Sequence, residues 1–228
     1  MNTAIRLRQL VWILLIAGVV TLIDWDYVMI LAVLLAAAVL AFETRDPLRA
    51  LGLMRPRSIP VAIAAGIGIG IALIVFSKLL LTPAAEALTG VPRDLSAFDD
   101  VRGNTARFLA LMPRIWIGAA IGEELVFRSF LIGRLETVFG GASRAATTTA
   151  VLLSSVVFGA AHAYQGPSGV LVTGVLGLLF AIVYVASGHR AWVNVMAHGV
   201  YDTASLALVL TNYDRVLIDL GHRLIPPP

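Results

Sequence analysis

Ionisable residues at helical spacing interrupt apolar sequence in the second half of the chain, and the first group is Gly122-Glu123-Glu124-Leu125-Val126-Phe127-Arg128. Glu124 and Arg128 are four residues apart, so on a helix they share a face and can form an ion pair. Glu123 projects about a quarter-turn away. A buried ion pair that merely locks two helices explains Glu124 and Arg128 but leaves Glu123 without a partner. Glu123 is therefore free to face a different neighbour, and a charged side chain within a membrane span marks a candidate functional site by default.

The second group is Phe158-Gly159-Ala160-Ala161-His162, at the end of an almost uncharged stretch. A lone histidine in such a place is often an ordinary interfacial residue. However, Glu123 lies 20 residues before Ser143, where we expect the chain to turn, and His162 lies 19 residues after it. In an antiparallel pair of helices that rise equally per residue, the two side chains are level. We therefore predict that Glu123 and His162 lie at the same depth.

The third group is Asn194, His198 and Asp202, which follow one another at intervals of four residues. On a helix these three side chains form one polar stripe. A stripe of this kind within a membrane span lines a water cavity, an ion path or a catalytic pocket.

The elements that position these groups are expected to be membrane helices. The chain has 228 residues, of which 59% are hydrophobic and only 14% charged, and its mean hydropathy is +0.89. Soluble domains carry about a quarter charged residues, so this composition excludes an ordinary soluble globule, a disordered chain and a coiled coil. The absence of cysteine excludes disulfides and thiolate chemistry. We predict an all-α, polytopic bundle of transmembrane helices.

About seven apolar segments are long enough to be spans, and we expect the N-terminus inside. They cover residues 10–23, 27–42, 59–81, 107–139, 144–162, 167–186 and 191–210, with a long polar loop at 82–106. This topology places nine basic residues inside: Arg6, Arg8, Arg45, Arg49, Arg55, Arg57, Arg134, Arg144 and Arg190. Five lie outside: Arg93, Arg102, Arg107, Arg215 and Arg223. Scattered arginines with this bias indicate membrane topology, not nucleic-acid binding.

Two regions are predicted. Residues 1–58 form a transmembrane hairpin and a basic linker, in which the first apolar run is interpreted as an uncleaved signal anchor. Residues 59–228 form a core whose motif-bearing helices cover 107–210. Small residues at Gly66, Gly68 and Gly70 predict close packing of another helix.

The three motifs resemble those of the CAAX prenyl protease and bacteriocin-processing family of intramembrane proteases. Its hallmarks are Glu-Glu-x-x-x-Arg, Phe-x-x-x-His and His-x-x-x-Asn/Asp on successive helices, and all three occur here in that order. The resemblance covers roughly residues 107–210. It implies hydrolysis of a peptide bond inside the membrane, by an endopeptidase that acts on a hydrophobic peptide or protein, prenylated or not.

The resemblance also implies roles for individual residues. Glu123 and His162 would activate a water, His198 would donate to the oxyanion with Asp202 alongside, and Glu124 and Arg128 would hold the group in place. Asp202 departs from asparagine, because an ionised carboxylate only accepts hydrogen bonds. Either Asp202 is protonated or it orients His198.

The sequence leaves open whether a metal takes part. Glu123, His162 and His198 have the chemistry of a zinc site with an open position, but no His-Glu-x-x-His motif is present, and a metal-free reaction is equally feasible. The expected partners are a hydrophobic or lipidated substrate and membrane lipid, with no nucleic acid. The expected location is a multi-pass protein of the membrane, the plasma (inner) membrane in a prokaryotic host.

Two alternatives stay open at this point. Gly166-Pro167-Ser168-Gly169 matches the serine motif of a rhomboid-like protease, with His198 as its base, although Ser168 also suits a helix cap. That reading leaves Glu123 and His162 unexplained. The ionisable stripes also fit a non-catalytic peptide-binding scaffold, an immunity protein or a transporter.

Overall fold

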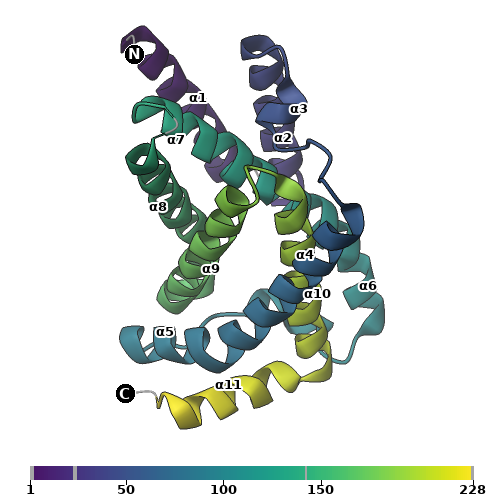
Figure 1. Ribbon diagram of the computed structural model, residues 1–228. Coiled ribbons are helices and arrows are strands. Elements are labelled where there is room, and N and C mark those ends of the chain that lie inside the picture. Colours follow the sequence, from purple (N-terminus) through teal and green to yellow (C-terminus); the bar gives the residue numbers. More distant parts are fainter. Residues whose placement is uncertain (1–2, 23–24, 142, 227–228) are drawn as a thin grey trace.

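The computed structural model describes residues 3–22, 25–141 and 143–226, and every regular element in these ranges is a helix, as predicted (Figure 1). The helices in chain order are α1 (Thr3–Leu22), α2 (Trp25–Glu43), α3 (Pro47–Ala50), α4 (Ile59–Phe76), η1 (Ser77–Leu81), α5 (Thr82–Thr89), η2 (Ser96–Val101), α6 (Thr105–Pro113), η3 (Arg114–Ile132), α7 (Gly133–Val138), α8 (Arg144–Ala161), η4 (Ala163–Gln165), α9 (Gly166–Ala186), α10 (Ala191–Thr211) and α11 (Tyr213–Leu224).

Four helical segments of the described residues are long and apolar enough to cross a membrane. They are Ile59–Thr89, Arg144–Ala161, Ala163–Ala186 and Ala191–Thr211, and Leu31–Glu43 is a shorter apolar helix. The last three agree closely with the predicted spans. Seven spans and an inside N-terminus stay predictions.

The helix that carries Glu123 runs from Thr105 to Val138 through α6, η3 and α7, close to the predicted 107–139. Its central part, η3, is π-helical and begins directly after Pro113. Proline has no amide donor, so it interrupts the regular hydrogen bonding of an α-helix. π-helical turns are rare and are frequent at functional sites. The short π-helical segment η1 likewise lies beside a proline, Pro83.

The start of the predicted loop was wrong, and one helix was not predicted. The loop expected from residue 82 starts later, because α5 continues the third span to Thr89 and ends at Gly90, whose φ of 70° is left-handed. The last predicted span ends at residue 210, but a further helix, α11, follows it. One side of this helix packs on η1 and α5, where Gly221 faces the Leu79 carbonyl and Pro83.

Helix α10 lies at the centre of the core and packs against α4, η3 and α9 (Figure 1). Its contact with α4 depends on glycine. A Cβ on Gly66 would lie 2.4 Å from Met196 Cβ, and one on Gly70 would lie 2.6 Å from the Ala197 carbonyl oxygen. Gly68 faces no atom within 4 Å. The predicted close packing is therefore confirmed for Gly66 and Gly70 and was wrong for Gly68.

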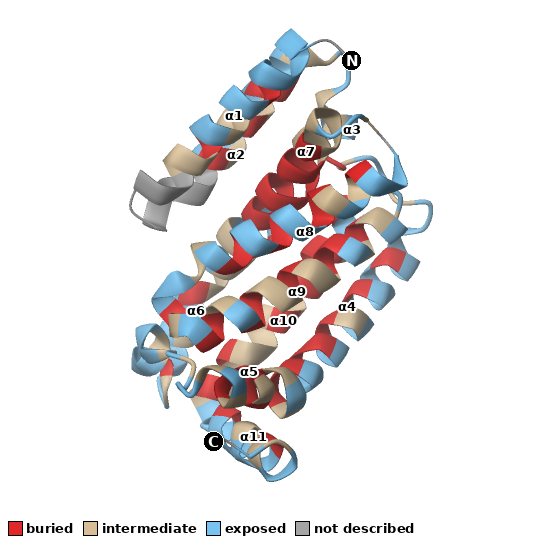
Figure 2. Cartoon of the chain, turned by 90° about the vertical axis from the view of Figure 1, so that its left-hand side faces the viewer, coloured by how far each residue is buried: buried red, intermediate tan, exposed pale blue. Residues whose placement is uncertain are grey.

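The hairpin of α1 and α2 stands at the side of the bundle, and the buried residues concentrate in the core helices (Figure 2). Glu43, at the end of α2, contacts both α1 and the core. Its carboxylate accepts hydrogen bonds from Trp12 Nε1 at 2.9 Å and Gln9 Nε2 at 3.3 Å, and it pairs with Arg8 and with Arg134 of α7.

The glycines of α4 give a matched test of the α4–α10 contact. Gly70→Ala is expected to destabilise the protein by about 1–3 kcal/mol, because the new methyl group must displace backbone. Gly68→Ala is the control and should not lower stability. Thermal unfolding of the detergent-purified variants measures both, and equal midpoints would contradict the packing.

Acid is expected to loosen α11. Burial would raise the pKa of Asp214, but hydrogen bonds from Arg102, at 2.9 Å to each oxygen, hold that pKa below its usual value. A carboxylate with a lowered folded pKa stabilises the fold above its unfolded pKa of about 3.9, and this stability is lost as pH falls through the folded value. Hydrogen exchange of α11 should therefore accelerate below pH 4, and Asp214→Asn should abolish the acceleration.

Candidate active site

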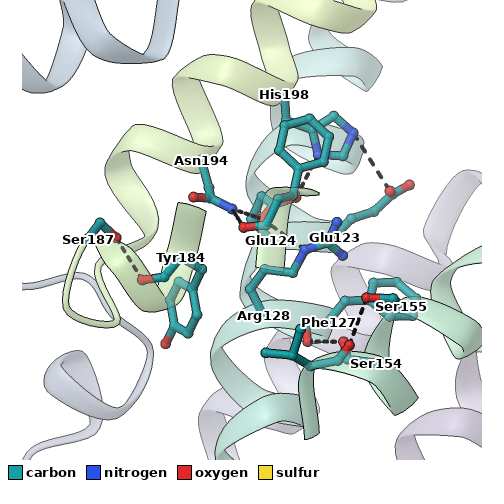
Figure 3. A network of polar contacts seen from close by, with 12 residues as sticks. Glu123, Glu124, Phe127, Arg128, Ser154, Ser155, Tyr184, Ser187, Asn194 and His198 are labelled. Carbon is teal, nitrogen blue, oxygen red and sulfur yellow. Dashed lines mark hydrogen bonds and ion pairs between the residues drawn. The ribbon is translucent and has the colours of Figure 1, made fainter. Parts of the chain in front are cut away.

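Glu124 lies at the centre of the polar residues that the sequence singles out. It is fully buried on η3, and its carboxylate faces α10. His198 Nδ1 lies 2.8 Å from one carboxylate oxygen, and Asn194 Nδ2 donates to the other at 3.0 Å (Figure 3). The first group, on η3, and the third group, on α10, therefore meet where the two helices cross.

Asn194 links a third helix to the same point. Its Nδ2 also donates to the carbonyl oxygen of Phe180 on α9, at 2.7 Å. The side chain is fully buried. Because one amide nitrogen contacts both η3 and α9, Asn194 sets the distance between them and α10.

Arg128 forms the predicted ion pair with Glu124, with 3.3 Å between its Nε and the carboxylate. Its guanidinium lies 4.2 Å from the centre of the Phe158 ring and 5.6 Å from that of Phe180. None of its three nitrogens makes a hydrogen bond to a described residue. The arginine is thus held by charge and by the faces of two aromatic rings.

Glu123 points away from Glu124, as Figure 3 shows. Its Oε2 lies 3.9 Å from His198 Nε2, too far for a direct hydrogen bond, and has no hydrogen-bond partner among the described residues. Glu123 lines a cavity of about 500 Å³, which His162, His198 and Asp202 also line. Glu123 and the three other motif residues therefore share one cavity.

His162 caps the C-terminal end of α8. Its Nδ1 lies 2.8 Å from the carbonyl oxygen of Phe158, which can only accept a hydrogen bond. Nδ1 therefore carries a proton, and in the neutral ring Nε2 is the basic nitrogen. The motif residue Phe158 packs against the imidazole, with 4.7 Å between ring centres. The structure thus brings His162 and Glu123 to one cavity, although they come from different helices.

Asp202 lies one turn beyond His198 on α10, and its Oδ2 is 3.4 Å from His198 Nε2. The two ring nitrogens of His198 therefore face carboxylates on opposite sides, Glu124 and Asp202. Of the two roles that the sequence leaves open for Asp202, this position suits the one that orients His198.

Comparison with known proteins gives one finding for this region. Residues 105–204 match the family model described as type II CAAX prenyl endopeptidase Rce1-like. Residues 105–204 are therefore similar to an Rce1-like domain. The predicted family is thereby confirmed, and the match indicates a CAAX-type protease and, with the apolar helices, an integral membrane protein. No curated protein and no solved structure matches the chain.

The Rce1-like domain does not arrange Glu123, His162 and His198 as a metal site. Among the described residues, no three histidine, aspartate or glutamate side chains are grouped so that they could share one ion. In addition, both nitrogens of His198 face carboxylates. We therefore derive no step of the reaction through a metal.

Ser168 does not take part in this cavity. It is fully buried in the first turn of α9, where its hydroxyl donates to the carbonyl oxygen of Val91 and lies 2.5 Å from Thr89 Oγ1. The helix begins at Gly166, so Ser168 is not its cap either. Its position disagrees with the rhomboid-like alternative and with the capping role.

Three residues beside the Rce1-like motifs escaped the sequence analysis: Tyr164 and Gln165, which follow His162, and Arg93 in the loop after α5. All three line the cavity. Arg93 donates to Gln165 Oε1 from Nε at 2.9 Å and from Nη2 at 2.6 Å. The polar residues just after His162 give weak sequence evidence that Tyr164 and Gln165 belong to the site. Nothing in the sequence indicates that Arg93 lines the same cavity.

The buried pair yields a stability prediction. Arg128→Met leaves the Glu124 carboxylate buried without its countercharge and is expected to cost about 3–5 kcal/mol. The double variant Glu124→Gln/Arg128→Met should cost less than Arg128→Met alone. Arg49→Met, which breaks an exposed pair with Asp46, should cost less than about 1 kcal/mol. Denaturant unfolding in detergent measures all three, and a mild Arg128→Met would contradict the pairing.

Proposed function

We propose that the protein is an intramembrane endopeptidase that hydrolyses a peptide bond in a hydrophobic peptide or protein, with or without a prenyl group. The observation that carries this proposal is the position of Glu123. Its carboxylate lies at the wall of a cavity, 3.9 Å from His198 Nε2, and His162 lines the same cavity. The Rce1-like match over residues 105–204 supports the same reaction class.

In the proposed reaction Glu123 is the general base. A water held between Glu123 and His162 loses a proton to the Glu123 carboxylate as its oxygen attacks the carbonyl carbon of the substrate. The intermediate carries an oxyanion on the former carbonyl oxygen. When the C–N bond breaks, Glu123 returns the proton to the leaving nitrogen, so that one carboxylic acid and one amine are released and the enzyme is unchanged.

His198 is proposed to stabilise the oxyanion. Glu124 holds its Nδ1 at 2.8 Å, and this contact turns Nε2 toward the cavity. A protonated Nε2 donates to the oxyanion as charge develops there. Glu124, Arg128 and Asn194 are positioning residues, because they reach the cavity only through His198 and the helix packing.

The lining of the cavity favours an apolar substrate. Leu95, Phe98, Leu111, Ile115, Leu176 and Phe180 contribute to its lining. The outer faces of the helices are also apolar, with Leu152 and Val156 of α8 half exposed or more, which suits contact with lipid in a multi-pass membrane protein. If the host is prokaryotic, the proposed location is its plasma (inner) membrane.

Cleavage by the detergent-purified protein tests the proposal. Its substrates are a farnesylated CAAX peptide and unmodified hydrophobic peptides. Glu123→Gln and His162→Ala are expected to lower kcat by about 10²-fold or more, because they remove acid–base groups. Ser168→Ala is the matched control and should retain activity. The chelator EDTA should leave the rate unchanged, because no step above uses a metal.

Two results would contradict the proposal. Full activity of Glu123→Gln would remove the general base. Tight binding of peptides by folded wild-type protein without any cleavage would instead favour the non-catalytic scaffold.

A further inference from the structure

We propose that α11 is an interfacial membrane helix, whose exposed apolar face inserts into the bilayer surface at the boundary between phospholipid headgroups and acyl chains. This face consists of Tyr213, Val216, Leu220 and Leu224, which are 60%, 56%, 46% and 65% exposed. The four residues are spaced by three or four positions, so they lie along one side of the helix. The inference goes beyond the proposed peptidase function and does not depend on it.

Another side of α11 is held by the protein. Asp214 is buried and accepts hydrogen bonds from both terminal nitrogens of Arg102, at 2.9 Å each. Gly221 is also buried, and a Cβ there would lie 2.6 Å from the backbone of η1. His222 Nε2 lies 2.7 Å from Glu86 Oε2 of α5. These contacts fix the rotation of α11 about its own axis, so the exposed apolar face is a defined feature of the fold.

A third side of α11 is charged and exposed. It carries Arg215, Asp219 and Arg223 at intervals of four residues. A helix with one apolar and one charged exposed side lies in the plane of the membrane interface, with its apolar residues among the acyl chains and its charged residues toward water. Arginine side chains are long enough to keep their charged ends at the headgroups from this position. Tyr213 suits the same level, because tyrosine is enriched where membrane meets water.

The position of α11 in the bundle favours lipid as the partner. Two of the segments that are long enough to cross a membrane, Ile59–Thr89 and Ala191–Thr211, end beside α11. The second of them continues into α11 through Asn212, whose φ of 61° is left-handed. Figure 1 shows α11 crossing the lower end of the bundle, next to α5. The surface of a bilayer is expected where its spans end, so α11 lies at that level.

The length of α11 limits how it can contact lipid. The helix has 12 residues and is therefore about 18 Å long, whereas the hydrocarbon core of a bilayer is about 30 Å thick. It is too short to cross the membrane and contacts lipid only by lying along the surface. The segments on which it packs also expose apolar side chains, Leu80 of η1 and Leu88 of α5. The apolar face of α11 is thus one part of a larger apolar surface at this end of the bundle.

The same face is too small to join two copies of the chain stably. Stable protein interfaces bury about 800 Å² on each partner and involve about 20–30 residues a side. The face on α11 offers four apolar residues of one short helix, bordered by the charged side of that helix. A bilayer surface needs no such area, because the spans already hold the protein in the membrane. We therefore assign the face to lipid.

Spin labels on the full-length protein in phosphatidylcholine vesicles test the inference. The chain has no cysteine, so single-cysteine variants carry one nitroxide each. Val216→Cys and Leu220→Cys label the apolar face, and Arg215→Cys and Asp219→Cys, one residue earlier, are the matched controls on the charged side. Oxygen concentrates among acyl chains, whereas a soluble nickel complex stays in water. Relaxation by oxygen is expected to exceed relaxation by nickel at the first two sites, and the order should reverse at the two controls.

Two results would overturn the inference. Stronger relaxation by nickel at all four sites would show that the apolar face lies in water. Dipolar broadening between Leu220→Cys labels, lost on dilution with unlabelled protein, would show that a second copy covers the face instead. All four substitutions replace exposed side chains, so their thermal unfolding midpoints should match wild type, and the two pairs of sites give independent answers. No step measures peptide cleavage, so failure here leaves the proposed peptidase function untouched.

Discussion

The buried charge of Glu124 is the constraint on which the rest of the site depends. A carboxylate removed from water must be matched by donors and countercharge, or the fold loses several kcal/mol. Here the partners come from different directions: Arg128 from the same helix, and Asn194 and His198 from α10. The same contacts that offset the cost of burying Glu124 also fix the direction of the His198 ring. The contacts that stabilise the fold at Glu124 are therefore the same contacts that orient His198 in the cavity.

The motif residues could be predicted because local spacing determines their faces. Glu124 and Arg128 pair at four residues, and Asn194, His198 and Asp202 lie along one side of α10. A charged residue in an apolar helix must be paired or face a polar cavity, so its partner can be inferred from the residues that share its helix face. The packing of Gly66 and Gly70 was predictable for the same reason, since only close helices need small residues.

The parts that escaped prediction depend on tertiary contacts or on weak local signals. Helix α11 has mixed polarity and no long apolar run, and its position depends on Arg102 pairing with Asp214 and on Gly221 fitting over Leu79. Likewise, the contact of Arg93 with Gln165 spans 72 positions of the chain. The π-helical form of η3 was also missed, because a proline at Pro113 is compatible with several kinds of helix start or bend.

Hydrolysis inside a membrane requires both an apolar substrate and water at the same point, and the lining of the cavity meets both requirements. Its wall combines leucine, isoleucine and phenylalanine with Arg93, Arg107 and Arg114. Arginine in contact with lipid tails is costly, so we expect these arginines to face water. Arg107 supports this, because it is exposed and pairs with exposed Asp100 at 2.6 Å. The cavity that Glu123 lines therefore reaches exposed residues beside the loop between α5 and α6.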